Sequence, residues 1–303
     1  MLRMKLLKDC CTKGFYKMGK YRVDFHIHTK FSDGQASPAE IVDAAKALGY
    51  QQIAITDHDG IDGLPEALEE GRRVDLTVIP GMELATETAS GIELHILGYG
   101  MDLADKTLLA AMEELARRRA VRNTKLIAAL QEMGYDISEE ELKKIQPNDY
   151  IGKPVIARAL IAKGYASSIP EVFQSKKMLG SETALAIKKE KLPASDAVKL
   201  IRESGGLPVL AHPIQAKKIG TPGSREFYQN MEGIVEKLVS CGLGGLECFH
   251  PDQDEKQSLR FVQMAQKYDL CITRGSDFHG KDFAEAEDTA QIEETKLIGL
   301  DVK

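Results

Sequence analysis

All seven histidines of this chain lie in short motifs of the kind that bind metal ions. Each motif ends or follows a short apolar run of the kind that forms a β-strand. Imidazoles at successive strand ends can converge, so this distribution predicts one shared site for several ions and metal-assisted chemistry. The seven histidines are His26, His28, His58, His95, His212, His250 and His279.

Two of these motifs place a pair of candidate ligands on one face of a strand. His26 and His28 are two positions apart, so both imidazoles project to the same side and can chelate a single ion. Asp277 and His279 repeat this spacing near the other end of the chain, with a carboxylate in place of the first imidazole.

A third candidate carboxylate, Glu83, follows a predicted strand at Thr77–Ile79 and a predicted Pro80–Gly81 turn. A carboxylate at such a position can bridge two ions, although each carboxylate taken alone could also be a helix cap or a solvated charge. Histidine, aspartate and glutamate ligands without thiolates favour Mn²⁺, Fe or Zn²⁺.

Composition excludes several other classes of protein. A net charge of −6 over 303 residues argues against a strongly basic nucleic-acid-binding surface, while a local basic patch stays compatible with it. No apolar run approaches the ~18 residues of a membrane span, and no protein partner is indicated. The five cysteines have no disulfide or metal-site spacing and no signal peptide is recognisable, so we expect reduced thiols in a cytoplasmic protein.

Strand and helix patterns alternate over residues 21–100 and again from about residue 195. Such repeats predict parallel strands joined by right-handed crossovers. The histidines spread over six strand ends, which favours a barrel of the triosephosphate-isomerase type over an open sheet with a single switch point.

Residues 101–194 interrupt this alternation with helical patterns. One long helical pattern, or two joined ones, covers 103–133, and a capping box at Ser138–Glu141 opens a shorter helix. We therefore expect a helical insertion over the barrel mouth at 101–194, a discontinuous barrel domain at 21–100 and 195–303, and an N-terminal extension at 1–20.

Four of the motifs, in this order, resemble those of the PHP family (polymerase and histidinol phosphatase). These are His26-Ile27-His28-Thr29, Thr56-Asp57-His58, Ala211-His212-Pro213 and Ser276-Asp277-Phe278-His279. The resemblance implies a distorted (β/α)7 TIM-like barrel with the helical insertion over its C-terminal face, and a metal-dependent phosphoesterase. Asp33 resembles the branch that hydrolyses nucleoside 3′,5′-bisphosphates and trims RNA 5′ ends, since histidinol phosphatases tend to have histidine there.

The resemblance also implies two or three divalent metal ions, with Glu83 as a bridging ligand. The implied ligand sets are His26, His28, Glu83 and Asp277 for the first ion, Asp33, His58 and His279 for the second, and Glu83, His95 and His212 for the third. His250 would either complete a site or contact the phosphate.

Such ions would make a metal-bridging hydroxide available at neutral pH, which would attack phosphorus in line with the leaving oxygen. A remaining ion would neutralise charge on the phosphoryl oxygens. We expect Asp33, His58 and His250 to be catalytic. Asp24 and Asp57 either orient ligand imidazoles or bind backbone at strand ends.

The segment Gly152–Leu160 resembles one that often reads Gly-Arg-Pro-His in this branch, but Lys153 and Val155 depart from it. Arg158 is retained, and its guanidinium suits a second phosphate. We expect Lys153, Arg158 and His250 to bind substrate. A basic run near the middle of the long helical pattern is either a solvated face with i,i+4 partners or a track for an RNA backbone. It consists of Arg117, Arg118, Arg119, Arg122 and Lys125.

The leading hypothesis is a phosphoesterase that acts on a nucleoside 3′,5′-bisphosphate or on the 5′ end of a short RNA. The alternatives are a small-metabolite phosphomonoesterase such as histidinol phosphatase, and a metal- and nucleotide-binding module without catalysis.

Overall fold

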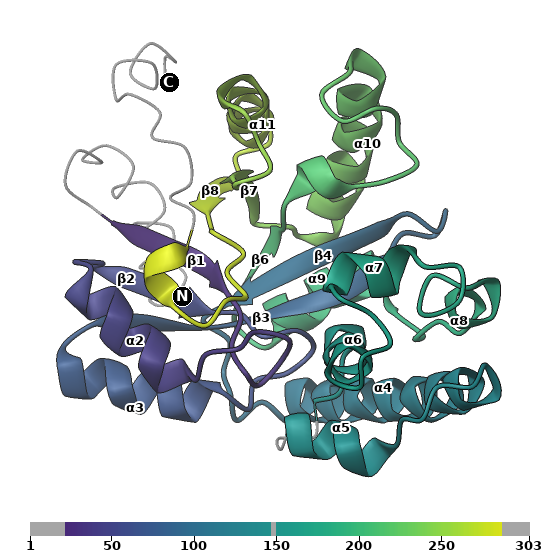
Figure 1. Cartoon of the computed structure of the whole chain (residues 1–303). Coiled ribbons are helices and arrows are strands. Elements are labelled where there is room, and N and C mark those ends of the chain that lie inside the picture. Colours follow the sequence, from purple (N-terminus) through teal and green to yellow (C-terminus); the bar gives the residue numbers. More distant parts are fainter. Residues whose placement is uncertain (1–21, 147–149, 287–303) are drawn as a thin grey trace.

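The computed structural model describes residues 22–146 and 150–286, with strands at the centre and helices around them (Figure 1). The extension predicted for residues 1–20 lies outside the described residues, as does the end of the predicted barrel region after residue 286. The strands are β1 Val23–Ile27, β2 Gln52–Ile55, β3 Thr77–Glu87, β4 Glu93–Tyr99, β5 Leu192–Pro193, β6 Leu207–Leu210, β7 Gly245–Phe249 and β8 Cys271–Arg274.

The sheet has the order β1-β2-β3-β4-β6-β7-β8, and the short β5 pairs with β3. Its two edges meet, because Ile27 at the end of β1 forms a parallel bridge with Phe278, beyond β8. The His28 N–H also donates to the Phe278 carbonyl over 2.9 Å. The sheet is thus a nearly closed seven-stranded barrel, and the barrel class predicted from the sequence is confirmed.

The expectation that all strands run parallel was wrong for β4. This strand is antiparallel to both β3 and β6, while the other neighbouring pairs on the main path are parallel. The reason is the short connection between β3 and β4, which is closed by a Thr88 N–H to Ile92 carbonyl bond of 2.8 Å and by Gly91 with a φ of +73°. A loop this short joins only antiparallel neighbours, since a parallel crossover needs a dozen or more residues.

The predicted turn at Pro80–Gly81 was also wrong, because β3 continues through it. Pro80 pairs with Ile55 of β2, and Gly81 pairs with Tyr99 of β4. The first part of β3 therefore pairs with β2, and the part from Gly81 onward pairs with β4. A Cβ at Gly81 would lie 2.7 Å from the Ile55 carbonyl oxygen, so only glycine permits this close approach. Glu83 therefore lies within the strand and not after a turn.

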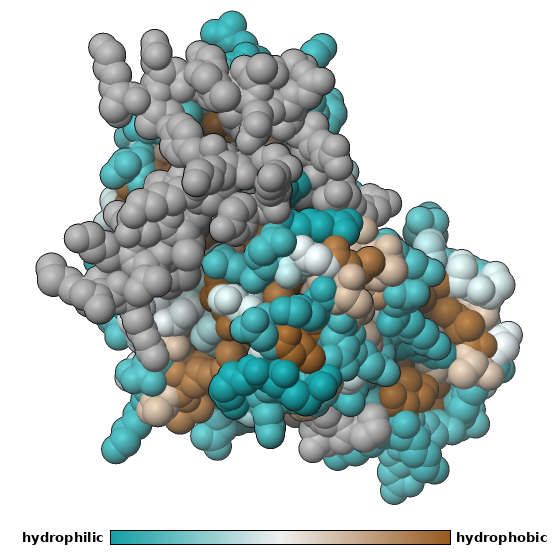
Figure 2. Space-filling view, turned by 90° about the vertical axis from the view of Figure 1, so that its left-hand side faces the viewer, coloured by the Kyte–Doolittle hydropathy of each residue, from teal (hydrophilic) through white to brown (hydrophobic). Residues whose placement is uncertain are grey.

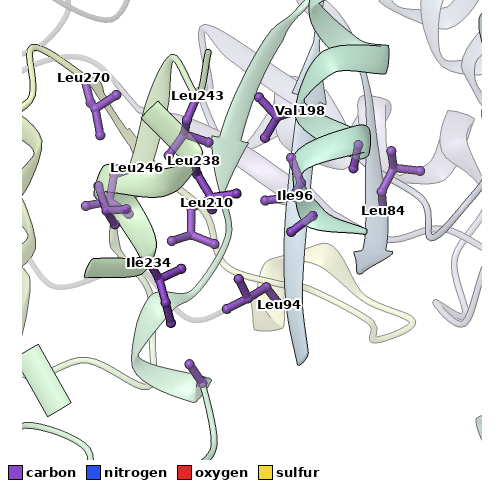
Figure 3. Packing of buried hydrophobic residues seen from close by; sticks show 14 of the residues in the cluster. Leu84, Leu94, Ile96, Val198, Leu210, Ile234, Leu238, Leu243, Leu246 and Leu270 are labelled. Atoms are coloured by element: carbon purple, nitrogen blue, oxygen red, sulfur yellow. The ribbon is translucent and has the colours of Figure 1, made fainter. Parts of the chain in front are cut away.

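Helices cover the outside of the barrel. Ser37 and Glu40 form a capping box at the start of the first of these helices. The largest hydrophobic cluster of the described residues lies between β3, β4, β6 and β7 and the helices that cover them, with Ile96, Val198 and Leu238 among its members (Figure 3). The helices are α2 Pro38–Ala47, α3 Leu64–Val74, α9 Ala194–Glu203, α10 Arg225–Cys241 and α11 Glu255–Lys267, with 3₁₀ turns η1 Pro213–Gln215 and η2 Phe283–Glu285.

Among the described residues between β4 and β5, five further helices gather on one side of the barrel (Figure 1). Part of this helical segment has a hydrophobic cluster of its own, centred on residues such as Leu130, Val155 and Leu160. The long pattern forms one helix, and the Ser138–Glu141 capping box is present. These helices are α4 Lys106–Glu132, α5 Glu139–Ile145, α6 Lys153–Ala162, α7 Ile169–Gln174 and α8 Glu182–Ala186.

The helical segment reaches the barrel at the carboxyl ends of β1 and β2. Gln146 donates to the carbonyls of Lys30 and Ser32, in the loop after β1, and Lys189 binds the carboxylate of Asp59, after β2. On the face seen in Figure 2, hydrophobic residues form separate groups among hydrophilic ones. Within residues 22–146 and 150–286, no helix is long and apolar enough to cross a membrane.

Candidate metal centre

Glu83 lies at the centre of the histidine cluster and is fully buried. β3 carries it beside the end of β2, where the Glu83 N–H donates to the Asp57 carbonyl over 3.1 Å and the Asp59 N–H donates to the Glu83 carbonyl over 2.8 Å. Its two carboxylate oxygens lie within 3.3 Å of five imidazoles. The distances are 3.3 Å to His26 Nε2, 3.3 Å to His28 Nε2, and 2.9 Å each to His58 Nδ1, His95 Nδ1 and His212 Nε2.

The two histidines of β1 also converge on Asp277. His26 Nε2 lies 3.4 Å and His28 Nε2 lies 3.2 Å from the same oxygen, Asp277 Oδ1. The closing contact between β1 and the chain after β8 brings these residues together, although they are separated by about 250 positions in sequence. The spacing that predicted paired ligands at each end of the chain thus corresponds to one cluster in the fold.

Asp33 reaches the other side of the cluster from the loop after β1. Asp33 Oδ1 lies 3.2 Å from His279 Nε2, and Asp33 Oδ2 lies 3.9 Å from His58 Nε2. The imidazoles of His28 and His279 stack with their centroids 4.1 Å apart. His58 lies against both Asp33 and Glu83. The groups of neighbouring ligands therefore share more residues than the three ligand sets that the resemblance implies.

Opposite charges set the electrostatics of the cluster. Burial by itself would raise the pKa of Glu83, but His58, His95 and His26 hold that pKa well below its ordinary value. Burial by itself would lower the pKa of His58, but the charges of Glu83 and Asp33 have the larger opposite effect and raise this pKa to about 10. Burial also lowers the pKa of His26, but the surrounding carboxylates raise it by more, so this pKa is well above its ordinary value. The carboxylates are therefore ionised, and their negative charge favours the binding of protons or other cations by the cluster.

A metal ion fits this donor set better than protons do. All nine predicted ligands fall into four overlapping groups whose donor atoms lie within 4.8 Å of one another. Five of the donor atoms are buried and have no hydrogen-bond partner among the described residues, and an ion would satisfy them together. These atoms are His26 Nε2, His28 Nε2, Asp33 Oδ1, His58 Nδ1 and Glu83 Oε2.

Sequence reasoning missed Glu247, in the middle of β7. Its Oε1 lies 3.1 Å from His26 Nδ1, and its Oε2 accepts the His212 backbone N–H over 2.6 Å. His212 has a φ of 22°, a strained value for a residue with a side chain, and this bond holds it there. The signal was a glutamate in an otherwise apolar, fully buried strand, which must have a partner inside the protein.

His250 lies beside the cluster and not in any of the four ligand groups. Its Nδ1 accepts the Asp252 backbone N–H over 3.1 Å, so the Nε2–H points toward Asp277 Oδ2, 3.4 Å away. Burial lowers the pKa of His250, but the bond to Asp277 and the charge of Glu247 raise it overall. A proton on Nε2 is thus available at the edge of the cluster.

Asp24 and Asp57 bind backbone, as one of the two alternatives predicted. Asp24 accepts the N–H groups of His26 and Ser276, over 3.2 and 3.0 Å. Asp57 accepts the Thr29 N–H over 2.8 Å and the Ser32 hydroxyl over 2.5 Å. Both carboxylates therefore fix the loops that carry the candidate ligands, and neither has an imidazole among these hydrogen-bond partners.

Two of the three residues expected to bind substrate, Lys153 and Arg158, lie on the helical segment, whereas His250 follows β7. Arg158 Nη1 donates to the Asp33 carbonyl over 3.4 Å, so it borders the cluster, whereas Lys153 lines a neighbouring cavity. The basic run divides into two parts. Arg117 and Arg118 pair with Glu114 as a solvated face would, while Arg119 and Arg122 are buried.

The chain is similar to known proteins over most of its length. A family model described as PHP domain matches residues 24–203. A phosphoribosyl 1,2-cyclic phosphate 1,2-diphosphodiesterase from Eggerthella lenta is 32% identical and aligns over 85% of this chain and 94% of its own length. A 3′,5′-nucleoside bisphosphate phosphatase from Chromobacterium violaceum is 26% identical over 89% and 93%, and a 5′-3′ exoribonuclease from Haemophilus influenzae is 27% identical over 85% and 90%.

Two solved structures have the same fold. A protein from Chromobacterium violaceum, described as an amidohydrolase with bound sulfate and no metal, superposes with a TM-score of 0.77 at 25% identity, covering 89% of this chain and 92% of that one. A proposed metal-dependent phosphoesterase from Bifidobacterium adolescentis superposes with a TM-score of 0.75 at 25% identity, covering 88% and 90%.

Proposed function

Because this chain belongs to the PHP family of metal-dependent phosphoesterases, we propose that it hydrolyses a nucleoside 3′,5′-bisphosphate or the 5′ end of a short RNA at the cluster around Glu83. The observation that carries the proposal is the position of Asp33. Its carboxylate lies 3.2 Å from His279 and faces the ligand cluster, in the place where the histidinol phosphatases of the family tend to have histidine.

We propose that two or three divalent ions, of Mn, Fe or Zn, bind to the nine ligands of the cluster. Glu83 would be shared between ions, because five imidazoles surround its two oxygens. When bound, such ions lower the pKa of water and neutralise negative charge on phosphoryl oxygens. The ligands are His26, His28, Asp33, His58, Glu83, His95, His212, Asp277 and His279.

The residues of the chain supply orientation and proton transfer. Glu247 holds His26 with its Nδ1 protonated and its Nε2 turned toward Glu83 and Asp277. His250 carries a proton on Nε2 at the edge of the cluster and donates it to a phosphoryl oxygen or to the leaving ribose oxygen. Asp33 and His58 orient the attacking water from the opposite side. Arg158, beside Asp33, binds the substrate from the helical segment.

A second candidate substrate is a phosphoribosyl cyclic phosphate. The specific observation in its favour is the relative from Eggerthella lenta, which is 32% identical and matches over nearly its whole length. Both candidates are riboses that carry two phosphate groups. We place the reaction in the cytoplasm, which the spacing of the five cysteines favours.

The test is phosphate release from adenosine 3′,5′-bisphosphate by the purified protein with Mn²⁺, side by side with nucleotide release from a 5′-phosphorylated RNA and phosphate release from phosphoribosyl 1,2-cyclic phosphate and histidinol phosphate. We expect turnover of the bisphosphate or the RNA to exceed that of histidinol phosphate. Preferred hydrolysis of the cyclic phosphate would select the second candidate, and preferred hydrolysis of histidinol phosphate would contradict both. If an Asp33→Ala variant bound nucleotide normally and the wild type hydrolysed none of these esters, the protein would be a binding module.

A further inference from the structure

We infer that Ser32, held by Asp57, selects the tautomer of His28 that binds metal. Neither Ser32 nor Asp57 is among the nine candidate ligands, and the inference rests on the metal centre of the proposed function. Ser32 lies in the loop after β1 and Asp57 follows β2, so the parallel pairing of these strands brings the two side chains together. Ser32 and His28 are 0% exposed and Asp57 is 2% exposed, so their hydrogen bonds are made inside the protein.

Asp57 accepts three hydrogen bonds from the loop after β1. Its Oδ1 accepts the Thr29 N–H over 2.8 Å and the Ser32 hydroxyl over 2.5 Å. Its Oδ2 accepts the Thr29 hydroxyl over 2.7 Å. Three donors around two oxygens are the pattern of an ionised carboxylate, which can only accept. The single proton of the Ser32 hydroxyl is therefore used on Asp57.

The same hydroxyl lies beside the ring of His28, with His28 Nδ1 3.4 Å from Ser32 Oγ. Because the proton of Ser32 goes to Asp57, Ser32 can only accept from the imidazole, and His28 Nδ1 must carry a proton. Asp33 Oδ1 also approaches Nδ1, but at 3.9 Å it lies beyond hydrogen-bond distance. A hydroxyl that donates to a carboxylate is polarised by it, which makes the hydroxyl oxygen a better acceptor.

The proton on Nδ1 leaves the lone pair of the neutral imidazole on Nε2, the nitrogen that faces the metal centre. His28 Nε2 is buried, has no hydrogen-bond partner among the described residues, and lies 3.2 Å from Asp277 Oδ1 and 3.3 Å from Glu83 Oε2. A neutral imidazole binds a metal ion through its unprotonated nitrogen. Ser32 and Asp57 thus prepare His28 as a ligand, as Glu247 is proposed to do for His26 by direct contact.

Packing alone does not choose between the two orientations of this ring. The centroid of His28 lies 4.1 Å from that of His279, with the rings stacked, and 4.5 Å from that of His58. A rotation of the ring by 180° would keep it in the same plane, so the stacking would be retained. It would, however, turn a C–H group toward Ser32 and another toward the metal centre. Ser32 is the group that distinguishes the two orientations.

The experiment compares Ser32→Ala with Thr29→Val. Both variants remove a buried hydroxyl that donates to Asp57, but the other partner of the Thr29 hydroxyl is the Phe31 N–H and not an imidazole. Titration of the chelated proteins with Mn²⁺ should show a ~10-fold loss of affinity for Ser32→Ala, the lower end for groups that orient metal ligands. Thr29→Val should lower the thermal midpoint without this loss. Ser32→Thr, which keeps a hydroxyl, should recover part of the affinity.

A second readout reports the proton itself and needs no variant. In the Zn²⁺-loaded wild type, ¹⁵N NMR should show His28 with a slowly exchanging proton on Nδ1 and none on Nε2; in Ser32→Ala the Nδ1 proton should exchange faster. A wild-type His28 that is unprotonated on Nδ1 would overturn the inference. Unchanged affinity of Ser32→Ala, or equal losses in Ser32→Ala and Thr29→Val, would overturn it as well. A wild type that bound neither Mn²⁺ nor Zn²⁺ would refute the proposed metal centre itself, and the inference with it.

Discussion

Glu247 fixes the orientation of His26, with its Oε1 3.1 Å from His26 Nδ1. The opposite ring nitrogen, Nε2, lies 3.3 Å from Glu83 and 3.4 Å from Asp277. Both residues are fully buried, so the carboxylate cannot turn to solvent and the imidazole cannot flip without losing its partner. A carboxylate behind a histidine in this way selects the tautomer that binds metal and makes the imidazole a stronger ligand.

The first prediction concerns Glu247→Gln, which keeps the shape of the side chain and removes its charge. We expect metal affinity, or activity at limiting metal, to fall by ~10- to 100-fold, the usual effect of groups that orient metal ligands. Titration of the chelated variant with Mn²⁺ measures this. Unchanged affinity would show that His26 does not depend on Glu247.

The second prediction concerns Glu83→Gln. Glu83 contacts five imidazoles, so its loss should affect every bound ion and lower activity by more than the ~100-fold expected for a group that only orients ligands. The number of ions retained after dialysis, measured by elemental analysis, should fall as well. A variant that kept its full metal content would contradict the shared role of Glu83.

The third prediction is a pH dependence of the metal-free protein. The ordinary pKa of histidine is 6.5, and in the folded protein the pKa of His58 is about 10. A raised folded-state pKa stabilises the protein fully below about 6.5, and this stabilisation is lost as the pH rises toward 10. In the presence of a chelator, the thermal midpoint of the wild type should therefore fall more steeply over this range than that of His58→Gln.

Metal-loaded protein should show the reverse trend, because a metal ligand must be unprotonated and apparent metal affinity rises with pH. Parallel pH profiles of the chelated wild type and His58→Gln would contradict the assignment of the raised pKa to His58.

The fourth prediction concerns the contact between the helical segment and the loop that carries Asp33. Gln146 donates to the carbonyls of Lys30 and Ser32, the latter over 3.0 Å. Gln146→Leu should destabilise the protein by about 1–3 kcal/mol, because the carbonyl of the buried residue Ser32 would lose this donor, and it should weaken metal binding through Asp33.

Gln131→Leu is the matched control for this variant. Gln131 also donates to a backbone carbonyl, that of Ile137, over 2.7 Å, but both residues belong to the helical segment. Gln131→Leu should lower the stability of the protein without a specific effect on its metal affinity. Equal effects of the two variants on metal affinity would show that Gln146 has no particular link to the site.

Local patterns in the sequence predicted several features of the fold. The two-residue spacing of His26 and His28 was enough to place both imidazoles on one face, and the capping box at Ser138 located the helix that follows. The antiparallel direction of β4 was not predicted. Because β3 was expected to end before Pro80, its connection to β4 could not be recognised as a short loop. Whether a strand stops at a Pro–Gly pair depends on the neighbouring strands. Here β2 pairs with Pro80 and β4 pairs with Gly81, so β3 continues.

The basic run is an instructive case. Its charges suggested a single surface, yet Arg119 and Arg122 share their helix face with Leu115 and Leu126, which are fully or almost fully buried. The spacing 115, 119, 122 and 126 follows the helical period and could have separated the two buried arginines from Arg117. What lies opposite that face depends on the tertiary fold, which the sequence alone does not provide.

The central claim is that the cluster around Glu83 binds metal ions that make this chain a phosphoesterase. The most direct measurement is phosphate release from adenosine 3′,5′-bisphosphate by the Mn²⁺-loaded wild type, the same protein after chelation, and the Glu83→Gln variant. We predict turnover in the first sample, its loss after chelation with recovery on adding Mn²⁺, and little or no turnover by the variant. Turnover that survives both chelation and Glu83→Gln would contradict the account.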